Sequence, residues 1–129
     1  MKYMLLMNGT KADWEWYMTW PKKDLEAQMA FMRQFSKELK DSGVYVSAEG
    51  LGLPQEATVV RAGADGEPVT DGVFPESKEF LAGYFIIDVE SREQALKIAA
   101  RLSNAPSPGD RGKQPIEVRQ VMSGPPEVQ

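Results

Sequence analysis

The strongest constraint on the fold is an amphipathic pattern over residues 22–41. Apolar residues recur there at intervals of three and four, as on one face of a helix: Leu25, Met29, Met32, Phe35 and Leu39. Pro21 precedes the segment and Ser42-Gly43 follows it, which are favoured places for a helix to start and stop. Because Met fills irregular gaps in cores, we interpret the stripe as a face that packs on a sheet.

Short apolar segments around this helix predict strands. Residues 2–8 form an apolar run before a glycine, and residues 44–54 begin with alternating residues. Glycines interrupt that second pattern and predict a bulge or bend near Gly50 and Gly52. The nearly continuous apolar run at residues 83–90 is typical of a central strand.

A second helix is expected over residues 91–102. Ser91 with Gln94 three residues later matches a capping box, and the apolar stripe that follows is Ala95, Ile98, Ala99 and Leu102. Pro, Gly and Asn predict a loop at residues 103–115, and alternation predicts a last strand at residues 116–122.

The order of these elements predicts an α+β fold. Two strand-helix-strand units with both helices on one face indicate a ferredoxin-like antiparallel sheet, with an extra β-hairpin. We expect one domain over residues 1–122 and a loose tail at residues 123–129. The second sheet face would be uncovered, so we expect a homodimer with sheets face to face.

Two Asp-Gly pairs lie close together in the middle of the chain. The pair at residues 65–66 lies between the β-rich runs 57–61 and 68–70, where it supplies the positive φ angles of a tight hairpin turn. The second pair begins at Asp71. Asp71 either holds a carboxylate beside a pocket, as a catalytic candidate, or is a turn residue that accepts backbone hydrogen bonds.

Three further residues complete a candidate site around Asp71. Glu49, at the end of the second predicted strand, can pair with Asp71 as a second catalytic carboxylate, or it is a solvated strand end. Phe74 is expected to anchor the loop and line a ligand pocket. Lys78 can neutralise an anionic ligand, although its segment has the composition of a solvated loop.

Aromatic residues cluster in the segment 9–21, predicted to be an irregular loop or a short helical turn. They are Trp14, Trp16, Tyr17 and Trp20. These side chains can form a lip over a small apolar ligand, since concave sites are lined mainly by such groups. Alternatively, they pack at a dimer contact, where aromatic residues are also enriched.

Composition excludes several classes of function. The net charge is −4 without a basic cluster, so nucleic acid is not expected as a partner. The apolar N-terminal run is too short for a membrane span and lacks a secretory cleavage site, so we expect a cytoplasmic protein. The chain has no Cys and no His, which excludes Ser-His-Asp chemistry, and we expect no cofactor, haem or tightly bound transition metal.

Five segments in order carry a family resemblance. They are "MKYMLLMNG", "LKDSGVYVSAEGL", "VTDGVFPESKEFLAGYFIIDVES", "ALKIAARL" and "IEVRQV", within residues 1–122. Together they resemble the YCII-related family, specifically its DGPF-domain branch. The resemblance implies a dimeric α/β barrel. The branch is named for Asp-Gly-Pro-Phe, which here reads Asp71, Gly72, Val73 and Phe74, with the proline replaced and Pro75 following.

The resemblance implies a fold and a site but no reaction. Members are largely domains of unknown function, some joined to or neighbouring extracytoplasmic-type sigma factors. The His and Asp pair proposed for enzymatic relatives cannot operate here because this chain has no His. Three hypotheses follow: a small-molecule binding or accessory module for an apolar or anionic ligand, a cofactor-independent isomerase or monooxygenase, and an interaction partner in sigma-factor-linked regulation.

Overall fold

The fold is built on one four-stranded antiparallel sheet. A computed structural model describes residues 1–71, 78–109 and 111–122. The strand order is β2-β5-β1-β6, and the strands are β1 (Lys2–Gly9), β2 (Tyr45–Gly50), β5 (Phe80–Asp88) and β6 (Glu117–Gln120). A long helix, preceded by a short one, joins β1 to β2, and another helix joins β5 to β6, which confirms the predicted ferredoxin-like α+β arrangement.

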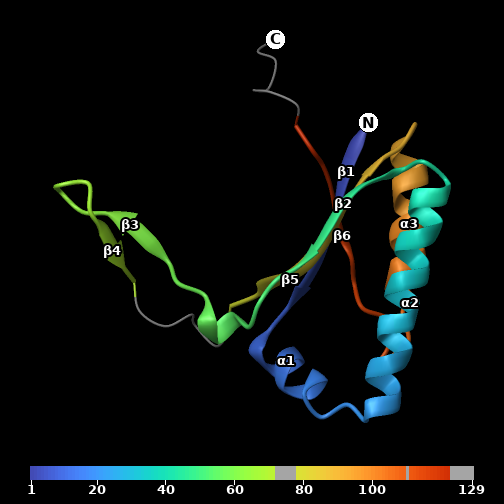
Figure 1. The fold of residues 1–129 in the computed structure, drawn as a ribbon, viewed down its shortest axis with the longest axis horizontal. Helices are drawn as coiled ribbons and strands as arrows, with labels where there is room; N and C mark the ends of the chain where they lie inside the picture. The colour runs from blue at the N-terminus through green and yellow to red at the C-terminus, as the bar shows by residue number, and fades with distance from the viewer. Residues whose placement is uncertain (72–77, 110, 123–129) are drawn as a thin grey trace.

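Two helices, α2 (Lys22–Asp41) and α3 (Arg92–Ser103), lie together on one face of this sheet (Figure 1). The end of α2 is set by Gly43, whose φ of 77° suits glycine. The Val44 amide there donates to the Leu39 carbonyl at 3.1 Å, and this bond closes a Schellman motif. No helix in the described ranges is both long and apolar enough to cross a membrane.

The start of α3 shows half of the predicted capping box. The Gln94 amide donates to Ser91 Oγ at 3.1 Å, as expected of an N-cap serine. The Gln94 side chain, however, accepts from the Glu90 amide, one residue before the cap. The predicted stripe of α3 is confirmed, since all four of its residues are buried: Ala95, Ile98, Ala99 and Leu102.

The core lies between the sheet and the two long helices. Alternate residues of the central strands face the helices and are buried: Tyr3, Leu5, Phe85 and Ile87. Phe35 of α2 meets one of them, Phe85, edge to face at 5.1 Å. Each fully buried aliphatic side chain contributes roughly 1.5–3 kcal/mol, so this layer supplies much of the stability.

Only the second half of the α2 stripe is core. Phe35 and Leu39 are buried, whereas Met29 is 56% exposed. The helix has 20 residues and its neighbour α3 has 12, so at about 1.5 Å per residue α2 extends well beyond α3. The first turns of α2 therefore extend past the end of α3 (Figure 1).

Strand β5 begins at Phe80 rather than at the predicted residue 83. Gly83 lies inside the strand and permits a close approach, because a Cβ there would lie 2.9 Å from the Glu49 carbonyl oxygen. The bulge or bend predicted near Gly50 and Gly52 is also not found at that position in the strand. The irregularity of β2 falls between Tyr45 and Ser47 instead.

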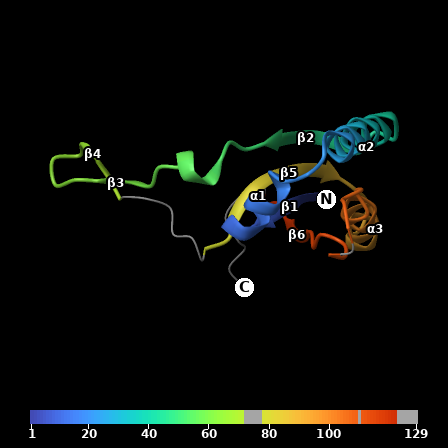
Figure 2. The ribbon, with the colours of Figure 1, turned by 90° about the horizontal axis from the view of Figure 1, so that it is seen from below.

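The β-hairpin is a separate two-stranded sheet, formed by β3 (Val60–Ala62) and β4 (Pro68–Thr70). A short 3₁₀ helix, η1 (Pro54–Glu56), precedes it. We call residues 59–71 the arm. Figures 1 and 2 show the arm extending from the sheet on the side opposite α2 and α3.

The turn of the arm differs from the predicted two-residue turn. Only Gly66 has a positive φ, of 84°, and Asp65 does not. The Gly66 amide donates to the Gly63 carbonyl at 3.0 Å, and the Gly63 amide donates to the Glu67 carbonyl at 2.8 Å. This is a three-residue loop in which glycine follows a type I turn. Asp65 acts through its carboxylate, which accepts from the Glu67 amide at 3.0 Å.

The other face of the main sheet, which we call the open face, is not covered by α2 or α3 (Figure 2). Its central side chains are Met4 and Leu6 of β1, paired with Ile86 and Tyr84 of β5. All four are half-buried. They form an apolar strip two strands wide.

Candidate functional site

The segment with the clustered aromatic residues folds as a helix, α1 (Lys11–Tyr17), at the end of β1 (Figure 1). Thr10 caps it: the Asp13 amide donates to Thr10 Oγ1 at 3.2 Å, and the Thr10 amide donates to Asp13 Oδ2 at 2.8 Å. This reciprocal pair satisfies two backbone donors of the first turn and fixes where the helix begins. Of the two predicted structures, the helical one is confirmed.

Helix α1 and the turn after it bring the four aromatic rings together. Tyr17 and Trp20 have centroids 4.9 Å apart, and Trp16 meets Trp20 edge-on at 5.1 Å. Trp14 stacks on Tyr17 at 5.9 Å. The Trp20 amide donates to the Tyr17 carbonyl at 3.1 Å, which turns the chain back over the helix. The sequence therefore located these residues correctly as one cluster.

Arg111 joins this cluster from the loop between α3 and β6. Its guanidinium lies over the Trp16 ring, 4.3 Å from the centroid. The same loop is tied down near β1, because the Gln114 side-chain amide donates to the Asn8 carbonyl at 3.2 Å and the Ser103 hydroxyl donates to the Gln114 carbonyl at 2.5 Å. Arg111 is exposed, and within the described residues no carboxylate pairs with it.

Trp20 is the buried centre of the cluster, with 8% of its surface exposed. Its indole Nε1 is buried and has no acceptor among the described residues. A buried donor without an acceptor costs about 1–3 kcal/mol, so such groups need an explanation. The aromatic cluster thus combines apolar walls with two donors that have no partner among the described residues: the Arg111 guanidinium, which lacks a carboxylate, and the Trp20 indole N–H, which lacks an acceptor.

Asp71 lies directly after β4, at the base of the arm. Its amide donates to the Val59 carbonyl at 2.8 Å, and its carboxylate accepts from Arg61 Nε at 3.0 Å. Both groups are well exposed, 44% for Asp71 and 65% for Arg61. These contacts give Asp71 a structural role in closing the hairpin.

Glu49 lies elsewhere, on the edge strand β2 of the main sheet. It pairs with Tyr84 across β5, and its side chain is exposed. No hydrogen bond or ion pair joins Glu49 to Asp71 in the part of the chain that the structure describes, so a carboxylate pair stays a prediction. Phe74, the third member of that candidate site, lies outside the described residues, and Lys78 is exposed.

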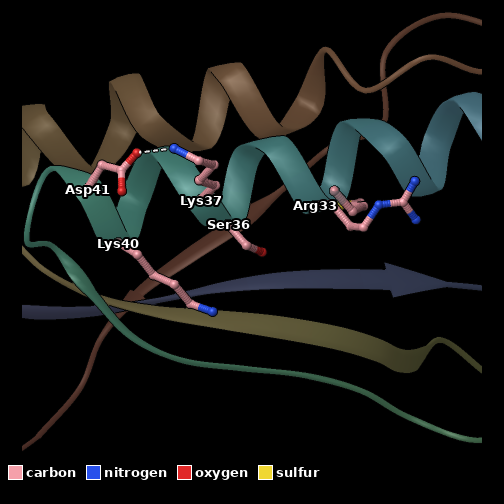
Figure 3. Close-up of a pocket in the computed structure, with 6 residues that line it drawn as sticks. Arg33, Ser36, Lys37, Lys40 and Asp41 are labelled. Atoms are coloured by element: carbon pink, nitrogen blue, oxygen red, sulfur yellow. Dashed lines mark hydrogen bonds and ion pairs between the residues drawn. The ribbon is translucent and has the colours of Figure 1, made fainter.

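An open hollow lies along α2, shown in Figure 3. Its lining comes from this helix alone: Met32, Arg33, Ser36, Lys37, Lys40 and Asp41. Lys37 Nζ bonds Asp41 Oδ2 at 2.6 Å, and this hydrogen bond raises the pKa of Lys37. Lys40 extends toward the strands and lies 4.8 Å from the Tyr45 ring centroid. Three charged side chains of the hollow, Lys37, Lys40 and Asp41, contact neighbours, and the lining comes from one helix, so we interpret the hollow as a solvated helix face.

The described residues were also compared with what a metal site requires. Among the described residues, no group of three or more acidic side chains is placed to hold a metal ion. The expectation that no transition metal binds tightly rests on the absence of His and Cys and stays a prediction.

Sequence reasoning missed Arg111 as a member of the aromatic cluster. It lies 95 positions after Trp16, in a loop rich in Gly and Pro, and only the antiparallel pairing of β6 with β1 brings the two together. By contrast, a local signal for α1 was present. Thr10 and Asp13 have the spacing of a capping box.

Comparison with known proteins gives two matches. A family model described as the YCII-related domain matches residues 1–122. A protein of Rhizobium meliloti (strain 1021), named "Uncharacterized protein R00369", is 33% identical over 98 residues, which cover 75% of this chain and 79% of that protein.

Proposed function

Since the chain belongs to the YCII-related family, in which the matched relative carries no assigned activity, we propose its function from the aromatic cluster. The protein is a small-molecule binding module, and its ligand is a small aromatic or apolar compound that carries a carboxylate. The observation behind this proposal is Arg111 stacked on Trp16 at 4.3 Å without a carboxylate partner in the described residues.

The chemistry of the cluster supports this ligand class. A guanidinium has its N–H groups in its own plane, so one held over an indole ring can still bind a carboxylate through two hydrogen bonds. Trp14, Trp16 and Tyr17 are half-buried and offer apolar surface beside that charge. A small movement of these rings would also let the Trp20 indole donate to the ligand, which would relieve its unpaired state.

The experiment is a titration of intrinsic tryptophan fluorescence with a panel of small aromatic carboxylates and their neutral methyl esters. We expect the acids to bind and the esters to bind at least about tenfold more weakly, because the esters lack the charge that Arg111 recognises. Arg111→Met keeps an unbranched stem over Trp16 and removes the charge, so it should abolish the preference for acids. Arg33→Met, at an exposed position of α2, is the matched control and should preserve it.

Two results would overturn this proposal. One is a panel in which no carboxylate changes the fluorescence at millimolar concentration. The other is an Arg111→Met protein that still prefers acids to esters as strongly as the Arg33→Met protein does.

We also propose that the protein is a homodimer, with the open face of each copy turned toward the other as in a dimeric α/β barrel. Support comes from the strip of Met4, Leu6, Tyr84 and Ile86, which is apolar and only half-buried in one chain. Sedimentation velocity at micromolar concentration tests this, and a monomer mass would contradict it.

Finally, we place the chain in the DGPF branch of the family. The support is the sequence from Asp71 to Phe74, which keeps three of the four residues of Asp-Gly-Pro-Phe. Of these residues, only Asp71 is within the described part of the chain.

A further inference from the structure

One face of the arm carries no charge. In the pairing of β3 with β4, Val60 lies opposite Thr70 and Ala62 lies opposite Pro68. Side chains alternate along a strand, so these four residues share one face of the hairpin. We call them the bare face. All four are exposed, and Val60 is 55% exposed.

The opposite face of the arm is different. Arg61 and Val69 pair across it, and the Arg61–Asp71 ion pair lies on it. An exposed ion pair suits a face that stays in water, because surface charges lose hydration when they are covered. The two faces of the arm therefore differ in charge: one carries the ion pair beside the exposed Val59 and Val69, and the other is neutral.

Burial of the bare face would also explain how the arm holds its shape. The arm is a two-stranded sheet that does not pair with the main sheet within the described residues. A lone hairpin is marginally stable in water, and exposed apolar strands are prone to misassociate unless something covers them. A partner surface is the simplest cover.

We infer that the bare face of the arm packs against a second copy of this chain. The inference rests on the homodimer proposed above and specifies one of its contacts. The arm extends on the side of the sheet opposite α2 and α3, which is the side of the open face (Figures 1 and 2). A copy that sits on the open face therefore lies within reach of the arm.

Two-fold symmetry doubles the area that this contact buries. Each copy has one arm and one open face, so an isologous dimer makes the arm contact twice. A standard interface buries about 800 Å² per partner, and two arm contacts share that area with the apolar strip between the sheets. The neutral bare face and the neutral strip of Met4, Leu6, Tyr84 and Ile86 also match in chemical character.

The test places the same charge on either face of the same hairpin. Val60→Glu alters the bare face, and Val69→Glu, in the paired strand, alters the ion-pair face and serves as the control. Both valines are exposed in one chain, at 55% and 36%, so neither change should unfold it, and far-UV circular dichroism checks this. The dimer Kd is measured by sedimentation over a concentration series.

We expect Val60→Glu to weaken the dimer roughly 100-fold or more, because a carboxylate would be buried against apolar surface, and Val69→Glu to change the Kd by less than about threefold. If wild type is dimeric and both variants remain so, the arm inference is wrong while the homodimer stands. If both variants dissociate equally, the assignment of the faces is wrong. If wild type is a monomer, the homodimer and the arm contact are both wrong.

Discussion

A single methyl group at Gly83 tests how closely β2 and β5 pack. A Cβ at this position would lie 2.9 Å from the Glu49 carbonyl oxygen and 3.2 Å from Met7 Cε. The Met7 side chain can turn aside, but the carbonyl is backbone of the paired strand. In Gly83→Ala, β2 must therefore move away by about half an ångström to reach ordinary contact.

The magnitude follows from two opposing terms. Forcing a methyl group into a tightly packed site costs typically about 1–3 kcal/mol. Replacing Gly by Ala also stiffens the unfolded chain and returns about 0.4–1 kcal/mol. We therefore expect Gly83→Ala to lower the free energy of unfolding by about 1–2 kcal/mol.

Gly50 provides the matched control because it is the cross-strand partner of Gly83. A Cβ at Gly50 meets nothing within 4 Å. Gly50→Ala should thus leave stability unchanged or raise it by up to about 1 kcal/mol. The assay is urea denaturation at one fixed protein concentration, since dimerisation would make stability depend on concentration. Equal losses in the two variants, or no loss in Gly83→Ala, would refute the close-packing argument.

The remaining predictions concern single contacts, each read from urea denaturation. Ile87→Ala should lower the free energy of unfolding by about 2–5 kcal/mol and Ile87→Val by about 0.5–1.5 kcal/mol, because Ile87 is fully buried. Equal and small losses in both variants would contradict tight packing around this side chain. Thr10→Ala should cost about 1 kcal/mol by removing the cap of α1, and Thr10→Ser should restore most of it; equal losses would contradict the cap. Asp71→Asn should cost less than about 1 kcal/mol because its ion pair is exposed, so a larger loss would indicate a further role. Asp41 raises the pKa of Lys37, so at neutral pH, below the ordinary lysine pKa of 10.5, this pair stabilises the fold, and the stabilisation is lost as pH rises through the raised value. Asp41→Asn should be less stable than wild type at neutral pH and should match it at that alkaline limit.

We call the main sheet with α2 and α3 the frame. Its helices and strands could be predicted because their sequence signals are local. The stripes of α2 and α3 and the apolar run of β5 each lie within about twenty residues, and burial against a sheet produces these periodicities directly. Two strand-helix-strand units then leave few arrangements in space. The ferredoxin-like order followed from these patterns without knowledge of any contact.

Glycine positions were harder to interpret from the sequence. The apolar run at residues 83–90 predicts a strand that starts at Gly83, yet Gly83 lies within β5. Its role depends on the carbonyl of Glu49, which belongs to a different strand. No local pattern reveals such an approach, since it depends on which strand lies alongside.

The candidate site was predictable only in part for the same reason. The four aromatic residues fall within seven positions, so their grouping is visible in the sequence. Arg111 enters the cluster through the loop before β6, a contact that exists only after the sheet has formed. An Asp before Gly is expected both for a turn residue and for a carboxylate that serves a site, so the sequence could not decide between these roles for Asp71. The ion pair of Asp71 with Arg61 supports the role as a turn residue.

The aromatic cluster and the arm lie in segments inserted between the strands and long helices of the frame, whereas the apolar strip of the open face belongs to the frame itself. Helix α1 lies between β1 and α2, the arm between β2 and β5, and Arg111 between α3 and β6. The buried core, in contrast, comes from the four sheet strands, the two long helices and the residues next to them. Changes in the inserted segments should therefore alter binding or association while the frame stays folded, as is common when function is carried by loops on a rigid scaffold. The variants at Arg111 and Val60 depend on this separation, because each must change one property without unfolding the chain.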